Sequence, residues 1–359
     1  MKQKFLKFLL TISILMLLLF SILFYNSPQK TPQFLDKDEV VLKNSIAEIT
    51  DIEINGVKQR ILIRGKSLSN PLLLHLHGGP GGPDRPLMDK NKNLEDLFTV
   101  CYWDQRGAGA SYADNIPVET MNQDQIIKDG LELSKYLLNR FEKKKLYLEA
   151  HSWGTLFGIQ MVYREPALFH AYFGIGQGSN SLKSEQLSYD FVYKSAKEAN
   201  DIKMIDKLEK IGRPPYSTDN EWIKNILIER RLLKKYEGPD SKKKLTMFSI
   251  YKDFVFYPEY SISDKLKALK GSPFSQKHLW PEAKRTNLFK NVTKFRVPIY
   301  IFQGTYDLST VTSVAKEYFD TIEAPKKQYY GFENSAHWPH ISEFKKYKLI
   351  IKTIVKSNI

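Results

Sequence analysis

The chain has 359 residues, of which 42% are hydrophobic and 13% aromatic, and its formal net charge is +14. A domain averages roughly 150 residues, so this length suggests two units, or one large α/β unit with an insertion and a sizeable core. A single cysteine, Cys101, excludes an intramolecular disulfide and any structural zinc site that needs two cysteines, and lysines spread along the whole chain favour a solvated basic surface over a nucleic-acid partner.

The first predicted element is an apolar segment at the N-terminus. Lys2, Lys4 and Lys7 precede an uncharged run over 8–25, which at about 1.5 Å per residue crosses most of a bilayer. Because positive flanks stay in the cytoplasm, we expect the rest of the chain outside it. Secretion after cleavage of a signal peptide is the alternative, but F-Y-N-S-P lacks the small residues of a cleavage site. We therefore predict a single-pass anchor in the cell membrane over 1–26.

A polar stalk over 27–46 and the first part of an α/β core over 47–179 follow the anchor. Apolar and polar residues alternate on both sides of Asn55-Gly56, which predicts a β-hairpin. Three short apolar runs come next, P-L-L-L-H-L-H, L-F-T-V-C-Y-W and K-L-Y-L-E-A-H, and each ends in glycine or a loop. Continuously apolar strands are typical of a sheet that is covered on both faces.

Helical patterns separate and follow these strands. Apolar residues at helical spacing predict helices over 120–141 and 155–163, and a further strand over 171–176. Strands that alternate with helices imply a mostly parallel sheet with right-handed crossovers.

The alternation stops over 180–291, where the sequence is charged. Helical periodicity marks 185–211 and 222–236, and we interpret the whole segment as a helical cap inserted into the core. Predicted turns interrupt it at Pro214-Pro215, Gly238-Pro239 and Gly271-Ser272-Pro273.

The second part of the core is predicted over 292–359, where the strand–helix alternation resumes. It consists of the strand V-P-I-Y-I-F-Q-G, a helix near 309–322, the strand K-Q-Y-Y-G-F and a terminal helix after Pro339.

Three polar residues come just after predicted strands, at the sheet edge where open α/β sheets bind their ligands. Ser152 follows one strand in L-E-A-H-S-W-G-T, Asp307 follows a later one, and His337 lies past the last. A serine hydroxyl is a weak nucleophile, so an imidazole must take its proton, and a carboxylate must hold that imidazole in the right tautomer. The chain order Ser, Asp, His is the order found in α/β-hydrolases.

The serine motif departs from the usual G-x-S-x-G, because Ala150 stands in the first glycine position. An ordinary loop hydroxyl is therefore the alternative interpretation of Ser152. We expect a small local shift to absorb the extra methyl group, since Gly154 and Gly158 still allow close packing of the following helix.

Other residues compete for the acid and base roles. Asp320 lies within a helical pattern and is expected to face solvent, while Glu333 precedes the loop of His337. His340 competes with His337 as the base. Structural roles are expected for His75, His77 and His151.

Three motifs together resemble the proline iminopeptidase group of α/β-hydrolases. They are H-G-G-P-G at 77–81, W-D-Q-R-G-A-G-A-S at 103–111 and H-S-W-G at 151–154. The resemblance covers most of 47–179 and the C-terminal piece from about Val297, and it matches the insertion only as a helical cap. It implies an α/β-hydrolase fold with helices on both faces of the sheet, and a serine hydrolase that needs no metal or organic cofactor.

Carried over residue by residue, the resemblance makes Ser152 the nucleophile, Asp307 the orienting acid and His337 the base. It assigns the oxyanion hole to the backbone N–H groups of Gly79 and Trp153. Elementary chemistry agrees, because a glycine after a strand lets backbone donors approach a substrate oxygen, and the first N–H groups of a helix have no partner within it.

The expected function is that of a membrane-anchored serine hydrolase that removes N-terminal residues, proline among them, from a small-molecule or short-peptide substrate. An esterase or lactonase with the same triad is the alternative, because both reactions pass through an oxyanion. A non-catalytic surface binding protein with this fold is a third, remote possibility. The resemblance implies acidic cap residues for the substrate amine, and the candidates are Glu185, Glu221, Glu229 and Glu282.

Polar residues near the other strand ends are interpreted as scaffolding. Asp104 and Arg106 are expected to form a buried ion pair that fixes their loop. Glu149, a carboxylate in an apolar strand, is expected to contact a basic or amide side chain.

Overall fold

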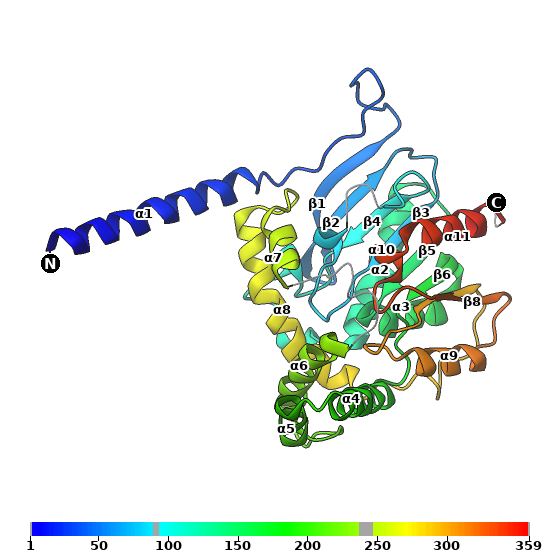
Figure 1. The fold of residues 1–359 in the computed structure, drawn as a ribbon. Coiled ribbons are helices and arrows are strands. Elements are labelled where there is room, and N and C mark those ends of the chain that lie inside the picture. The colour runs from blue at the N-terminus through cyan, green and yellow to red at the C-terminus, as the bar shows by residue number, and fades with distance from the viewer. Residues whose placement is uncertain (1, 89–92, 237–246, 358–359) are drawn as a thin grey trace.

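A computed structural model describes residues 2–88, 93–236 and 247–357 (Figure 1). Its centre is an eight-stranded sheet in the order β1-β2-β4-β3-β5-β6-β7-β8. β1 (Ile46–Ile54) and β2 (Val57–Gly65) form the predicted hairpin, and β2 pairs antiparallel with β4. From β3 to β8 every pairing is parallel. These strands are β3 (Leu72–Leu76), β4 (Thr99–Trp103), β5 (Leu146–His151), β6 (Phe169–Ile175), β7 (Ile299–Gly304) and β8 (Lys327–Phe332).

Helices cover both faces of the sheet, as the continuously apolar strands predict. In β3, Leu72 and Leu74 belong to the larger core cluster, while Leu73 points to the opposite face. This alternation is the two-residue period of a strand, and it gives each face its own apolar core. The first face is covered by α2 (Gln123–Arg140), α3 (Trp153–Arg164) and α9 (Thr312–Thr321), and the second by α11 (Phe344–Ser357), which follows the short α10 (Pro339–Ser342).

The segment between β6 and β7 is helical, and it forms a cap beside the sheet (Figure 1). α4, α5 and α6 share a small core of their own, to which Val192, Leu208 and Leu233 contribute. Within the described residues, the cap consists of the helices α4 (Ser181–Glu198), α5 (Ile202–Ile211), α6 (Asp219–Tyr236), α7 (Met247–Val255) and α8 (Ile262–Ala283).

Two details of the cap differ from the sequence prediction. The helix expected over 185–211 is broken at Asp201, whose side chain caps the start of α5. The turn expected at Gly271-Ser272-Pro273 lies inside α8. A side chain at Gly271 would approach the Gly107 carbonyl oxygen to 2.7 Å, so α8 needs glycine where it packs against that loop. Pro214-Pro215 lies in the α5–α6 connection as predicted, and Gly238-Pro239 lies outside the described residues.

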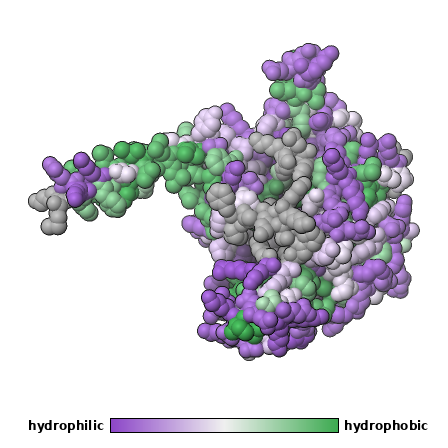
Figure 2. All heavy atoms as spheres, viewed as in Figure 1, coloured by the Kyte–Doolittle hydropathy of each residue, from purple (hydrophilic) through white to green (hydrophobic). Residues whose placement is uncertain are grey.

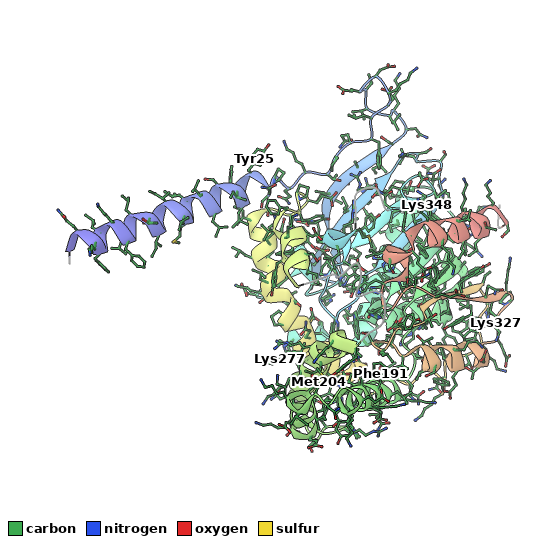
Figure 3. The ribbon with its side chains drawn as sticks, in the orientation of Figure 1. Tyr25, Phe191, Met204, Lys277, Lys327 and Lys348 are labelled. Carbon is green, nitrogen blue, oxygen red and sulfur yellow. The ribbon has the colours of Figure 1, made fainter. Side chains whose placement is uncertain are left out.

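An apolar helix, α1 (Lys2–Tyr25), projects from the body of the molecule (Figures 1 and 2). Figure 3 labels Tyr25, where α1 reaches the body. The segment that follows, predicted as a stalk, is hydrogen-bonded to the turn between α7 and α8. Lys30 N donates to Pro258 O at 3.2 Å, and Thr31 Oγ1 donates to Glu259 Oε1 at 2.7 Å. The start of this segment therefore lies against the cap.

Candidate active site

The turn between β5 and α3 holds Ser152 in a strained conformation. Its φ of 53° and ψ of −119° lie outside the regions that residues with a side chain commonly adopt. The Ser152 N–H donates to Ile175 O at 2.9 Å, which fixes the turn to the neighbouring strand. A side chain at Gly154 would lie 2.6 Å from Leu76 O. Glycine there lets the start of α3 pack directly against the end of β3.

A glycine on α3 explains how an alanine can stand in the first glycine position of the usual serine motif. Ala150 is completely buried in β5. A Cβ atom at Gly158 of α3 would lie 3.0 Å from the Ala150 methyl carbon. The space for that methyl group is therefore provided by a glycine on the helix instead of one on the strand.

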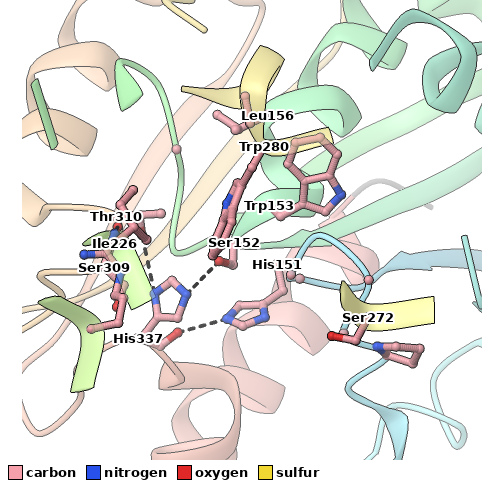
Figure 4. Close-up of a pocket in the computed structure, with 18 of the residues that line it drawn as sticks. His151, Ser152, Trp153, Leu156, Ile226, Ser272, Trp280, Ser309, Thr310 and His337 are labelled. Carbon is pink, nitrogen blue, oxygen red and sulfur yellow. Dashed lines mark hydrogen bonds between the residues drawn. The ribbon is translucent and has the colours of Figure 1, made fainter. Parts of the chain in front are cut away.

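Ser152, His337 and Asp307 form one chain of hydrogen bonds. Ser152 Oγ donates to His337 Nε2 at 2.7 Å (Figure 4), and His337 Nδ1 donates to Asp307 Oδ2 at 2.9 Å. The three residues follow β5, β8 and β7, so the parallel sheet brings together side chains that are far apart in sequence. This arrangement allows a proton to move from the hydroxyl to the imidazole.

Asp307 is almost completely buried, and many donors surround its carboxylate. Ser309 N and Thr310 N each donate to Oδ1 at 2.9 Å, while Gln303 Nε2 and Thr310 Oγ1 donate to Oδ2 at 2.9 and 2.8 Å. Burial acts to raise the pKa of Asp307, but the charge and hydrogen bonds of His337 and Thr310 outweigh it and lower that pKa below its ordinary value. Asp307 is therefore a carboxylate, as an acceptor for the His337 N–H must be.

The competing acids lie elsewhere. Asp320 is exposed on α9 and pairs with Lys316 one helical turn earlier, with Nζ and Oδ1 2.5 Å apart. Glu333 is exposed on the loop after β8. Both carboxylates therefore lie at the surface, whereas Asp307 is buried.

A buried network behind the serine accounts for two further predictions. His75 Nδ1 lies 2.5 Å from Glu149 Oε2, and its Nε2 lies 2.9 Å from Asp84 Oδ1. Glu149 thus contacts a basic side chain, as predicted. Burial acts to lower the pKa of His75, but the two carboxylates outweigh it and raise that pKa to about 10. His75 is therefore a charged structural histidine. Burial lowers the pKa of His77 to about 4.

His151 connects this network to the base. Its Nε2 donates to the backbone oxygen of His337 at 3.0 Å, and its Nδ1 lies 3.6 Å from Asp84 Oδ2. His340 is buried beside it, with ring centres 4.8 Å apart. One donor atom each from Asp84, His151 and His340 lie within 4.8 Å of one another. Ligands of a tetrahedral zinc ion lie about 3.4 Å apart at bond lengths of about 2.1 Å, so these side chains would have to draw together to share an ion.

The predicted oxyanion-hole residues lie beside Ser152 on the wall of one cavity. Gly79 has a φ of 123°, and a Cβ atom there would lie 2.5 Å from Gly81 N. Only glycine fits this tight turn. Trp153 is the first residue of α3, and its indole Nε1 donates to Gln105 Oε1 at 3.1 Å.

The cavity between the sheet and the cap has a volume of about 680 Å³. Ser152 and His337 lie at one wall, and Figure 4 shows Ile226, Trp280 and Leu156 around them. Most of the lining is apolar, and the cap helices α6, α7 and α8 provide much of it. The cap therefore gives a bound substrate mainly apolar surroundings.

Comparison with known proteins identifies the fold family of this chain. The family model described as "alpha/beta hydrolase fold" matches residues 71–344. The chain belongs to the α/β-hydrolase fold family. It is 36% identical to the probable aminopeptidase YbaC of Bacillus subtilis over 304 residues, which cover 84% of this chain and 94% of that protein. It is 26% identical to a proline iminopeptidase of Clostridium botulinum over 295 residues, which cover 80% and 90% of the two chains.

A solved structure shows the same fold. The proline iminopeptidase-related protein from Thermus thermophilus matches with a TM-score of 0.60 and 17% identity, over 88% of this chain and 99% of that one. The sequence-based identification of an α/β-hydrolase similar to the proline iminopeptidases is therefore confirmed, and the protein is a hydrolase.

In this α/β-hydrolase, two of the four candidate cap glutamates lie at or near the cavity. Glu185 lines it with its side chain 13% exposed, and Arg230 Nη2 donates to its Oε1 at 2.6 Å. Burial raises the pKa of Glu185 to about 7, with Arg230 acting against this shift and Glu229 adding to it. Glu229 is buried behind Glu185 and accepts from Arg230 Nη1 at 2.6 Å and from Ser188 Oγ at 2.5 Å. Sequence reasoning missed Arg230.

The other two glutamates do not reach the cavity. Glu221 is exposed at the start of α6 and accepts from Thr218 N at 3.2 Å. Glu282 accepts from the backbone N–H of Gln123 at 2.6 Å, at the start of α2. Both stabilise the N-terminus of a helix, where an acidic group is favourable.

The ion pair predicted between Asp104 and Arg106 is wrong, although both residues are buried. Asp104 accepts from Ala110 N at 2.8 Å and from the Tyr260 hydroxyl at 2.5 Å. Arg106 forms a buried ion pair with Asp129 of α2, at 2.7 Å between Nε and Oδ2. The two side chains point to different elements, the cap and α2, and both partners are distant in the sequence.

Proposed function

We propose that this protein is a membrane-anchored serine hydrolase of the proline iminopeptidase type, which removes N-terminal residues from short peptides. The observation that carries the proposal is the hydrogen bond of 2.7 Å between Ser152 Oγ, on a strained turn, and His337 Nε2. The aminopeptidase and proline iminopeptidase among its relatives support the reaction type.

The proposed reaction has two halves. Ser152 Oγ attacks the carbonyl carbon of the N-terminal residue while His337 Nε2 takes the hydroxyl proton, and Asp307 stabilises the imidazolium. The N–H groups of Gly79 and Trp153 donate to the oxyanion. His337 then passes the proton to the leaving amine, and the tetrahedral intermediate collapses to the acyl-enzyme as the peptide bond breaks. Water, activated by His337 in the same way, hydrolyses the acyl-enzyme.

Glu185 is the proposed partner of the substrate's free amine. Its carboxylate is at the cavity wall, and a bound ammonium group would favour the ionised form of a carboxyl group whose pKa burial has raised to about 7. Arg230 would then share Glu185 with the substrate.

Hydrolysis of esters or lactones by the same triad is the second candidate. It is favoured by the ion pair between Arg230 and Glu185, which already neutralises the one acidic candidate on the cavity wall, and by the mostly apolar lining. A neutral substrate would need no further charge partner there.

The nucleophile is tested by labelling with a fluorophosphonate. We expect one adduct on the peptide that contains Ser152, no adduct in Ser152→Ala, and a labelling rate lowered by several orders of magnitude in His337→Ala. His340→Ala is the comparison variant for the base, and it should keep labelling while it remains folded. Labelling that persists in Ser152→Ala contradicts the mechanism.

The substrate class is tested by comparing kcat/KM for a prolyl amide, its N-acetylated form and a short ester. An aminopeptidase should lose most activity on acetylation, and Glu185→Gln should lower kcat/KM for the amide far more than for the ester. Fast ester turnover with no turnover of either amide selects the second candidate.

The anchor is the helix α1. Its length and composition suffice to cross a membrane, and none of its apolar span is buried in the protein. With Lys4 and Lys7 on the cytoplasmic side, the domain that carries Ser152 is extracytoplasmic. Protease added to intact cells should digest this domain, and digestion only after lysis contradicts the topology. The mass of the mature protein distinguishes a retained α1 from a cleaved signal sequence.

A further inference from the structure

The junction between α1 and the body is fixed by one buried lysine of the cap. Lys265 Nζ donates to Asn26 O at 2.9 Å and to Ser27 Oγ at 2.7 Å, directly after the last residue of α1. It also donates to Val255 O at 2.7 Å, at the end of α7. The end of α1 is thus bound to α7 and α8 together, and Figure 1 shows α1 leaving the body beside these two helices.

The two helices that hold this junction also line the cavity that contains Ser152. Tyr251 and Phe254 of α7 and Leu269 of α8 belong to its lining. Leu269 lies four residues after Lys265, which is about 6 Å along the helix axis. The part of the cavity wall that Leu269 forms is therefore about one helical turn from the point where α1 is attached.

A group of large apolar side chains is exposed on these two helices, which lie beside the end of α1 (Figure 1). It consists of Tyr251 and Phe256 at α7 and of Leu266 and Leu269 on α8, all of which are exposed large side chains. We call it the α7–α8 apolar face. Isolated exposed apolar residues are common, but a group beside an apolar helix is typical of a membrane contact. Aromatic residues such as Tyr251 are favoured at the interface between lipid and water.

We propose that the α7–α8 apolar face lies in the headgroup layer of the membrane that α1 spans, so that the cavity takes amphiphilic substrates from the bilayer surface. Their apolar part enters between α7 and α8, and their scissile carbonyl reaches Ser152. This inference depends on the proposed function and on the placement of α1, and it names peptides or esters with a lipid-soluble portion as the substrate class. Exposed Lys252 on α7 would face anionic lipid headgroups.

The test uses the full chain in vesicles of phosphatidylcholine and phosphatidylglycerol. Leu266→Cys places a reactive thiol on the α7–α8 apolar face, and Leu349→Cys places one on α11, where Leu349 is 65% exposed against 57% for Leu266. The natural Cys101 is buried, and burial raises the pKa of its thiol, so an environment-sensitive fluorophore reacts at the introduced site. We expect blue-shifted emission and quenching by nitroxide lipids at position 266 but not at 349. Equal emission and quenching at the two positions overturns the proposal.

A second arm measures catalysis with Leu266→Glu and Leu349→Glu. We expect Leu266→Glu to lower kcat/KM at least fivefold for a long-chain acyl ester carried in the vesicles, and to leave a short water-soluble ester unchanged. Leu349→Glu should change neither value. If the wild type hydrolyses neither ester, the proposed serine hydrolase function is contradicted. An unchanged rate on the vesicle substrate in Leu266→Glu overturns the membrane inference alone.

Discussion

Gly304, the last residue of β7, offers a sharp test of how the site is held together. A methyl group there would lie 1.9 Å from Ala336 O and 2.5 Å from Ser335 O, on the loop that carries His337. Non-bonded heavy atoms pack at roughly 3.5 Å, so Gly304→Ala should push this loop back by about 1.5 Å. A displacement of about 1 Å at a catalytic group can lower the rate about 10²-fold. We expect a fall of at least that size in kcat/KM.

The neighbouring strand provides a matched control. Gly331 of β8 has nothing within 4 Å of a Cβ atom, so Gly331→Ala should keep kcat/KM within about twofold of the wild type. The assay is the hydrolysis of a short ester, together with the rate of fluorophosphonate labelling at Ser152. Urea unfolding checks that the Gly304→Ala protein is folded, since overpacking costs about 1–3 kcal/mol. A folded Gly304→Ala protein with nearly full activity would refute the reasoning.

Three further predictions concern charges that the structure places around the site. Asp307→Asn should lower kcat about 10³–10⁴-fold, because an amide favours the wrong tautomer of its histidine, whereas Asp320→Asn should leave steady-state kinetics unchanged. His75 has a pKa of about 10 in the folded protein against about 6.5 in an unfolded chain, so its stabilisation is full below pH 6.5 and is lost as the pH rises towards 10. The wild type should lose up to about 1.4 kcal/mol per pH unit there relative to His75→Gln, measured by urea unfolding. Arg106→Met should lower the free energy of unfolding by about 3–5 kcal/mol, because it leaves the buried Asp129 carboxylate without its cationic partner.

Each of these has a result that contradicts it. Normal kcat in Asp307→Asn removes that carboxylate from the mechanism. Parallel pH profiles of stability for the wild type and His75→Gln mean that the histidine is not charged in the folded state. A loss below about 1 kcal/mol in Arg106→Met shows that the buried pair adds little to folding.

The parts of the site that follow strands were predictable from the sequence. Apolar runs mark buried strands, and in a parallel sheet their carboxyl ends meet at one edge. Their places after strands, together with the family resemblance, singled out Ser152, Asp307 and His337, and the structure brings these side chains together. Ser152 has a positive φ because it lies in the sharp turn between β5 and α3.

Contacts between distant elements could not be predicted from one sequence. Arg106 pairs with Asp129 of α2, and nothing in their spacing indicates this. The local sequence predicts a turn at Gly271, but the residue lies inside α8, where the close approach to the Gly107 carbonyl leaves no room for a side chain. The cap glutamates show the same limit, because Arg230 determines the charge around Glu185 and lies on another helix.

The C-terminal part of the chain determines when, during synthesis, the site around Ser152 can form. His337 lies on the loop after the final strand, and Tyr347 of α11 donates to the buried carboxylate of Glu149 in the middle of the sheet. When Ser152 of a nascent chain has left the ribosome, the chain still lacks the loop of His337. It also lacks α11, the helix that covers the second face of the sheet. Such a chain cannot form the hydrogen bond between Ser152 and His337. The order of synthesis itself therefore keeps the site incomplete until the last strand and the loop after it have been made.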